Sequence, residues 1–241
     1  MSSRHHLAAE RDGLLGTLKS VLEIVVFAIF IVTFIVQPFR IPSGSMEPTL
    51  RVGDFLLCDK QSYARAGRLD RLVLPPARVE RGDLVVFHYP VDPQLHLVKR
   101  VVGLPGDRIR MRGGRVLVNG NLLQEPYAFY SPSRPNGFRD EFPSLLEADP
   151  NVDLRWWIRL RGSVVDRDVI VPLDSYFVLG DNRNDSEDSR YWGFVPRTAI
   201  VGRPLLVYFT IPAAEDIQGR SVGQRLRDVL QTGLRSFRVL R

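Results

Sequence analysis

Residues 94–107 read QLHLVKRVVGLPGD, an apolar run that carries isolated charges and ends in a Pro-Gly turn signal. Runs of the same kind lie on both sides, separated by Gly-, Pro- or Asp-containing segments: DFLLC (54–58), DLVVFHY (83–89), RVLVNG (115–120), DVIVP (168–172) and YFVLG (176–180). Short runs at this spacing are typical of an all-β domain. Between Gln37 and Thr210 we expect no long amphipathic helix, so the sequence predicts a mainly β fold.

The lysine at position 99 is unusual for this chain, which has thirty arginines and only three lysines. Alternate residues of a strand share a face, so Lys99 is expected beside Leu95, Leu97 and Val101. An ammonium group on an apolar face loses hydration, which lowers its pKa, and a neutral lysine is a general base. Arginine stays protonated and cannot do this. The alternative is a strand lysine whose charged end reaches water at the sheet edge.

A serine in a constrained turn is the candidate partner for such a base. The stretch IPSGSMEPT covers residues 41–49, where Pro42 and Pro48 restrict the backbone and Gly44 permits a close approach next to Ser45. Taken alone, this pattern favours a structural turn over a nucleophile.

Histidine is the other residue type that could serve as the base. His5 and His6 precede an apolar segment, and they cannot reach Ser45 if that segment spans a membrane. His96 is expected on the strand face opposite Lys99. His88 therefore stays as a competitor of Lys99.

The stretch VLGDNRNDSEDSRYWGFVP, residues 178–196, is dense in short polar side chains and carries charges of both signs. A solvated loop after a strand is one interpretation. A cross-linked polar network that braces a site is the other, because a solvated loop does not need Asp, Asn, Arg, Ser and Trp packed together before a glycine.

An apolar segment covers residues 14–36, but its uncharged part, IVVFAIFIVTFIV, has only thirteen residues. A bilayer requires roughly 20, so a span needs the preceding turn, with Lys19 and Glu23 four apart on one helical face. A buried core helix and a signal-peptide segment are the alternatives, although QPFR at 37–40 lacks a small-x-small cleavage pattern. We expect an uncleaved transmembrane anchor, with a slight basic bias toward an inside N-terminus.

The net charge of +6 is concentrated at the C-terminus, where Arg220–Arg241 contains six arginines and one aspartate. The body is nearly neutral, which disfavours nucleic-acid binding. The tail has apolar residues at near-helical spacing, so it either lies on anionic lipid as a basic amphipathic helix or packs back onto the domain. A single cysteine, Cys58, excludes an intramolecular disulfide.

Together these stretches resemble the type I signal peptidases of bacteria, membrane-anchored serine proteases that remove signal peptides from exported proteins. The motifs that carry the resemblance, in chain order, are PSGSMEPTL, VGDFLLCDK, RGDLVVF, KRVVGLPGD and GDNRNDSEDSRYWGFVP. It implies a transmembrane helix followed by an antiparallel β-sheet catalytic domain with an inserted smaller β-rich domain. The implied regions are a cytoplasmic tail (1–13), the anchor (14–36), the catalytic domain (37–106 and 172–212), the insertion (107–171) and a basic tail (213–241).

The resemblance implies that Ser45 is the nucleophile and Lys99 its general base. Ser43 would hold the oxyanion together with the backbone N–H of Ser45, and Ser186 would orient the lysine. Two bracing pairs are implied, Asp188 with Arg190 and Asp181 with Arg100. The pocket for small side chains before the cleavage point would be formed by Phe39, Ile41, Pro42, Met46, Leu50, Leu97 and Val98.

The implied reaction needs no cofactor and no metal. Expected partners are signal peptides of exported preproteins and the lipid bilayer. Nucleic acid is not an expected partner, and the protein is expected to be a monomer. The expected location is the inner (cytoplasmic) membrane, single-pass, with the catalytic domain on the extracytoplasmic (periplasmic) side. Three alternatives stay open: a specialised peptidase of the same superfamily, a membrane-anchored β-domain that only binds partners, and a nucleic-acid binder.

Overall fold

The computed structural model describes residues 2–63, 78–146, 148–211 and 222–240. The chain divides into two units, Met1–Gln37 and Pro38–Arg241. The first unit is formed by helix α1, Ser2–Phe34, in which Lys19 and Glu23 make the expected pair at 3.9 Å. Among the described residues no helix is long and apolar enough to cross a membrane, so the transmembrane segment expected at 14–36 is not found there.

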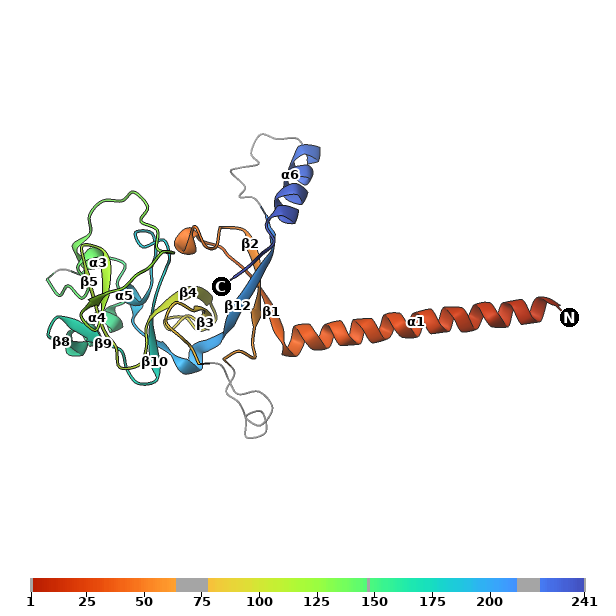
Figure 1. The fold of residues 1–241 in the computed structure, drawn as a ribbon, viewed down its shortest axis with the longest axis horizontal. Coiled ribbons are helices and arrows are strands. Elements are labelled where there is room, and N and C mark those ends of the chain that lie inside the picture. The colour runs from red at the N-terminus through yellow and green to blue at the C-terminus, as the bar shows by residue number, and fades with distance from the viewer. Residues whose placement is uncertain (1, 64–77, 147, 212–221, 241) are drawn as a thin grey trace. The chain divides into compact units, whose positions relative to one another are not determined.

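The larger sheet has eight strands among the described residues, in the order β1-β2-β12-β3-β4-β10-β11, with β13 also paired to β12 (Figure 1). The strand pairs β2–β12, β12–β13, β12–β3, β3–β4, β4–β10 and β10–β11 are antiparallel, as predicted. Its strands are β1 (Val36–Arg40), β2 (Asp54–Asp59), β3 (Leu84–His88), β4 (His96–Gly103), β10 (Ser175–Leu179), β11 (Val195–Pro196), β12 (Ile200–Thr210) and β13 (Arg238–Val239).

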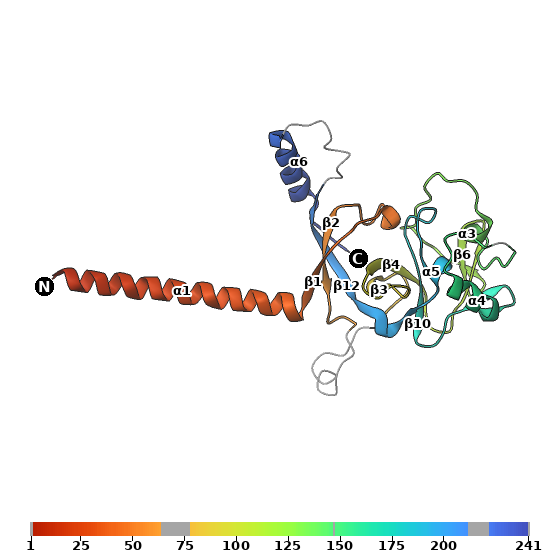
Figure 2. The same cartoon turned by 180° about the vertical axis from the view of Figure 1, so that it is seen from behind.

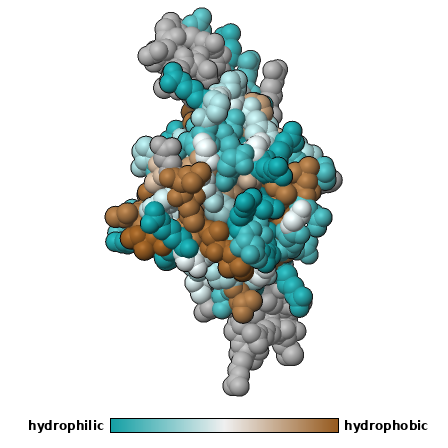
Figure 3. Space-filling view, turned by 90° about the vertical axis from the view of Figure 1, so that its left-hand side faces the viewer, coloured by the Kyte–Doolittle hydropathy of each residue, from teal (hydrophilic) through white to brown (hydrophobic). Residues whose placement is uncertain are grey.

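A second antiparallel sheet has five strands in the described part of the chain, in the order β7-β6-β5-β9-β8. Figure 2 shows the molecule from behind, with β6 of this sheet labelled. Figure 3 views the molecule from the side on which this sheet lies, where apolar patches are interspersed with polar surface. The strands are β5 (Arg108–Arg112), β6 (Arg115–Val118), β7 (Asn121–Leu122), β8 (Val164–Val165) and β9 (Asp168–Ile170).

The two sheets share one core. Side chains of β5 and β6, such as Ile109 and Val116, belong to the same buried cluster as Val101 and Phe177 of the larger sheet. A smaller cluster lies beside β2 and β12 and includes Leu56 and the only thiol. The domain limits at 37–106, 107–171 and 172–212 stay predictions.

The predicted strand runs all form, as β2, β3, β4, β6, β9 and β10. Each of them contributes buried apolar side chains, although Ile170 of β9 stays 39% exposed. β3 is buried along most of its length, since β4 and β12 flank it. The sequence did not predict several strands, among them β5 and the eleven-residue β12. In RIRMR of β5, Ile109 and Met111 face the core while arginines alternate with them. This is the period of a half-buried strand.

The helical segments are short in the region where none was expected to be long. They are η1 (Gly44–Met46), α3 (Gly137–Asp140), α4 (Leu154–Ser163), α5 (Ser189–Trp192) and η2 (Arg197–Ala199). The ten-residue helix α4 was not anticipated. Asp153 accepts a hydrogen bond from Trp156 N at 2.9 Å, and Trp156 and Leu160, four residues apart, are buried.

The described part of the C-terminal tail packs on the domain. After α6 (Val222–Arg235), strand β13 pairs with β12 and Leu240 N donates to Leu205 O at 2.8 Å. Arg238 forms an ion pair with the buried carboxylate of Asp54. Of the two interpretations of the tail, packing onto the domain therefore holds for residues 236–240, whereas residues 213–221 and 241 lie outside the described residues.

Candidate active site

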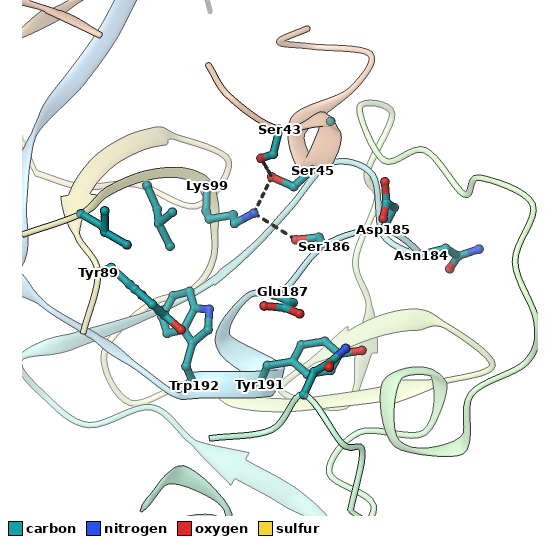
Figure 4. Close-up of a pocket in the computed structure, with 14 residues that line it drawn as sticks. Ser43, Ser45, Tyr89, Lys99, Asn184, Asp185, Ser186, Glu187, Tyr191 and Trp192 are labelled. Carbon is teal, nitrogen blue, oxygen red and sulfur yellow. Dashed lines mark hydrogen bonds between the residues drawn. The ribbon is translucent and has the colours of Figure 1, made fainter. Parts of the chain in front are cut away.

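Ser45 lies in the single turn η1, immediately beside the side chain of Lys99 (Figure 4). Lys99 Nζ is 2.6 Å from Ser45 Oγ, and Ser43 Oγ lies 3.4 Å from the same oxygen. The Ser45 carbonyl accepts a hydrogen bond from Asn182 N at 3.1 Å, and the Gly44 carbonyl accepts one from Asn182 Nδ2 at 3.3 Å. The turn is thus fixed to the polar segment 178–196.

Lys99 projects from β4 into a site where only 3% of the residue is exposed. Burial lowers the pKa of Lys99 to about 8, and the charge of Arg190 acts in the same direction. The carboxylates of Asp188 and Asp181 act against this shift. Leu95, Leu97 and Lys99 line one cavity, as strand alternation predicts.

His88, the competing base, is held elsewhere. Its Nδ1 is 2.8 Å from Pro93 O, and its ring lies 4.4 Å from that of His96, its cross-strand neighbour. His88 does not line the cavity that contains Ser45. The described geometry therefore joins Ser45 to lysine and not to histidine.

A continuous hydrogen-bond chain runs from Lys99 to a buried ion pair. Lys99 Nζ donates to Ser186 Oγ at 3.1 Å, and Ser186 Oγ donates to Asp188 Oδ2 at 2.8 Å. Arg190 contacts both carboxylate oxygens of Asp188, each at 2.8 Å. Although burial alone would raise the pKa of Asp188, Arg190 holds it below its usual range.

The second predicted pair, Arg100 with Asp181, is bidentate. Arg100 Nε and Nη2 lie 2.8 and 2.6 Å from the two carboxylate oxygens, and neither side chain is more than 5% exposed. Thr49 Oγ1 donates to the same carboxylate at 2.6 Å. This pair therefore connects β4, the segment after Ser45 and the start of the polar segment.

The close backbone approach predicted at Gly44 occurs at Gly180 instead. A Cβ added at Gly44 would meet only the flexible side chain of Glu47, at 3.4 Å. A Cβ added at Gly180 would lie 2.2 Å from Ser186 Oγ and 2.4 Å from Ser45 O. The expectation for Gly44 is wrong, because the polar segment meets the carbonyl of Ser45 at Gly180.

Other supporting residues were also missed. Asn182 holds the Ser45 turn, and Arg183 forms a buried pair with Glu125, with Nη1 2.6 Å from Oε2. Asn182 and Arg183 belong to a stretch that the sequence marked as a possible network. Thr49 and Glu125 carry no such signal, since their partners are far away in sequence.

The predicted pocket residues divide into two groups. Ile41, Met46 and Leu50 are buried in the smaller core cluster, and Phe39 and Val98 pack against it. Leu97 lines the cavity beside Ser45, and Pro42 is exposed.

Within the described residues no group of three or more His, Cys, Asp or Glu could hold a metal ion.

A family model described as "Signal peptidase, peptidase S26" matches residues 14–209. Signal peptidase I of Pseudomonas aeruginosa is 38% identical over 206 residues, covering 80% of this chain and 72% of that protein. Signal peptidase I of Aquifex aeolicus is 33% identical over 220 residues, covering 78% of this chain and 81% of that protein.

A solved signal peptidase I from Enterococcus faecalis V583 aligns with 52% of this chain and 96% of its own at 27% identity. Its TM-score of 0.34 is too low to establish a shared fold. The family match and the coverage of the relatives are sufficient without it: this chain belongs to the signal peptidases of peptidase family S26.

Proposed function

We propose that this chain removes signal peptides from exported preproteins, with Ser45 as the nucleophile and Lys99 as its general base. The observation that carries the proposal is the 2.6 Å contact between Lys99 Nζ and Ser45 Oγ in a buried setting. Because the pKa of Lys99 is lowered to about 8, a substantial neutral fraction exists near neutral pH. A neutral amine can take a proton from the serine hydroxyl.

The Ser186 hydroxyl orients this base. The Ser186 hydroxyl donates its hydrogen bond to Asp188, so toward Lys99 its oxygen can only accept a hydrogen bond. One N–H of the lysine is thereby directed at Ser186, which leaves the nitrogen lone pair free for the Ser45 hydroxyl. The ion pair with Arg190 keeps the Asp188 carboxyl ionised, so that Asp188 can accept the hydrogen bond from Ser186.

The reaction proceeds by acyl transfer. Ser45 Oγ attacks the peptide carbonyl as Lys99 takes its proton, and the lysine then returns that proton to the leaving nitrogen. Water, deprotonated by the same lysine, hydrolyses the acyl-enzyme. Ser43 Oγ and the Ser45 backbone N–H would hold the oxyanion, a role supported by the proximity of Ser43 to the nucleophile.

The substrate would lie as an extended strand beside the segment that leads to Ser45. Main-chain pairing would give affinity, and a shallow apolar wall would admit only small side chains before the cut. Phe39, Ile41, Met46 and Leu50 support this assignment, because they gather in one cluster next to the Ser45 turn. Pro42, Leu97 and Val98 complete the proposed wall.

We also propose that the chain works at a membrane, with its catalytic part on the extracytoplasmic side. Helix α1 supports the membrane location, because Leu22, Ile24, Phe27 and Ile29 are each 60% or more exposed. Exposed apolar side chains at this density are favourable in lipid and unfavourable in water. Retention in the membrane fraction after an alkaline carbonate wash is expected, and release into the wash would contradict this part.

The catalytic assignment is tested by cleavage of a model preprotein with detergent-solubilised wild type and Ser45→Ala, with sequencing of the new N-terminus. We expect a single cut by the wild type and none by Ser45→Ala. Ser133→Ala, which changes an exposed serine, is the matched control and should cleave normally. Cleavage at the same bond by Ser45→Ala would exclude the proposed nucleophile.

A further inference from the structure

The cavity at Ser45 and Lys99 extends well past these two residues. Its volume is about 440 Å³, and the wall beyond Ser186 is formed mainly by aromatic, amide and acidic side chains (Figure 4). These are Tyr89, Asn151, Asn184, Asp185, Glu187, Tyr191 and Trp192. The space is larger than proton transfer between a serine and a lysine requires, so it is available to a substrate group.

Two carboxylates in this wall differ from their neighbours. Asp181 and Asp188 are buried and paired with arginine. Asp185 and Glu187 are exposed and have neither an ion pair nor a side-chain hydrogen bond within the described residues. Among the described residues of the wall Lys99 is the only cationic side chain, so these two carboxylates face at most one positive charge. The wall therefore carries net negative charge in either protonation state of Lys99.

The aromatic part of the wall, like its carboxylates, suits a cationic ligand. Tyr89 meets Trp192 edge to face, with ring centroids 5.7 Å apart. Burial raises the pKa of Tyr89, and the carboxylate of Glu187 adds to this, so the acidic field reaches across the cavity. Aromatic faces beside carboxylates favour a cation.

Trp192 supplies a separate observation that points to a ligand. The residue is 2% exposed, and its indole Nε1 has no hydrogen-bond partner among the described residues. A buried indole N–H is ordinarily paired. A peptide carbonyl would satisfy it. The wall thus matches a ligand that has a cationic group and a peptide backbone.

The proposed reaction generates such a ligand, and the inference rests on that function. When the C–N bond breaks, the acyl carbon is bonded to Ser45 Oγ and the nitrogen takes the proton that Lys99 held. The free amine then gains a proton from water, because an α-amino group has a pKa of about 7.7–8.0. We propose that the cavity beyond Ser45 binds the new N-terminus of the cleaved product, with Asp185 and Glu187 attracting its α-ammonium group.

The position of the cavity favours the leaving segment over the signal peptide. Of the seven residues proposed for the wall before the cut, only Leu97 lines this cavity, and Phe39, Ile41, Met46 and Leu50 do not. It shares Ser45 and Lys99 with the site of bond cleavage. The leaving nitrogen is therefore the first product atom that it can receive.

The test compares two peptides with the sequence of the first residues of the mature product, one with a free N-terminus and one N-acetylated. Binding is measured by calorimetry at pH 7.5 with wild type, the double variant Asp185→Asn/Glu187→Gln, and Asp174→Asn. Asp174 is an exposed carboxylate outside the cavity wall and serves as the matched control.

We expect the wild type to bind the free peptide about fivefold more tightly than the acetylated one. The ratio should fall to near one in the double variant and stay unchanged in Asp174→Asn. It should also decline between pH 7.5 and 9.5, as the peptide amine loses its charge. Equal binding of both peptides by the wild type, or an unchanged ratio in the double variant, would overturn the inference.

Calorimetry reads binding without turnover, so the two proposals fail separately. If the wild type cleaves a preprotein but binds both peptides equally, the product site is wrong and the peptidase assignment stands. If the ratio behaves as expected while Ser45→Ala still cleaves, the product site stands and the nucleophile assignment is wrong. The circular-dichroism spectrum and the unfolding midpoint of the double variant should match those of the wild type, which separates loss of binding from misfolding.

Discussion

Two regions of the unit Pro38–Arg241 contain Arg–Asp pairs with similar N–O distances in opposite surroundings. Beside Lys99, Arg190 lies 2.8 Å from Asp188, and the two side chains are 1% and 0% exposed. In the second sheet, Arg108 lies 3.1 Å from Asp166, with 39% and 80% exposed. The two pairs differ little in distance but strongly in exposure to water. In the buried pair each charge is compensated only by its partner, whereas in the exposed pair water also solvates both charges.

The comparison explains why the buried region can tune a base. The charges around Lys99 are unscreened, so each changes its proton affinity, and burial makes the largest contribution. The exposed pairs of the second sheet have no such group to act on. Removing members of each region in turn tests whether this difference is real.

The largest effect is expected for Lys99→Arg, which keeps a positive charge but removes a usable base. Turnover should fall by about 100- to 10,000-fold. The measurement is the initial rate of preprotein cleavage above pH 8. Lys60→Arg changes the other lysine of the same unit and should cleave normally. Activity within a few-fold of wild type in Lys99→Arg would mean that another group is the base.

The next effect is on stability. Arg190→Met leaves the Asp188 carboxylate buried without its partner, which should lower the free energy of unfolding by about 3–5 kcal/mol. Urea unfolding followed by fluorescence measures this. Asp166→Asn removes the exposed pair of the second sheet while Arg108 keeps its contact with Asp168 at 3.0 Å, so this variant should leave the midpoint nearly unchanged. Similar losses in the two variants would remove the distinction drawn between the two regions.

Steric crowding also differs between the buried network and the outer region. Gly180→Ala would force Ser186 Oγ and Ser45 O away from the new Cβ. Because small misplacements of reacting groups are costly, the cleavage rate should fall by at least about tenfold. Gly162→Ala in helix α4, where no atom lies within 4 Å of the added Cβ, should have wild-type activity. A fully active Gly180→Ala enzyme would show that the close packing is dispensable.

The smallest effect concerns pH. With a Lys99 pKa of about 8, the neutral fraction and the acylation rate should rise with pH and level off above about 9. At pH 7 the rate should be about one tenth of the plateau. Single-turnover measurements across pH 6–10 provide the profile. A rate that stays level down to pH 6 would be incompatible with a lysine base of this pKa.

Local sequence predicted the residues whose surroundings are set by neighbouring residues. Strand alternation indicated which face of β4 carries Lys99, and both Leu95 and Leu97 line its cavity. The same reasoning failed for Gly44, because the tight contact is made by Gly180, more than 130 residues away. It also missed helix α4, whose burial depends on the shared core.

The sequence by itself determined a mainly β fold and a membership in the signal peptidases, because period-2 apolar runs and ordered motifs are local properties of the chain. It marked Ser45, Lys99 and the polar segment as candidates. Only the tertiary structure decided that Ser45 meets lysine and not His88 and that Thr49 and Asn182 hold the turn. It also decided that the side chains of Asp185 and Glu187 have no partner within the part of the chain that the structure describes. The reason is physical: hydrogen bonds, burial and the pKa of Lys99 depend on which distant segments exclude water together.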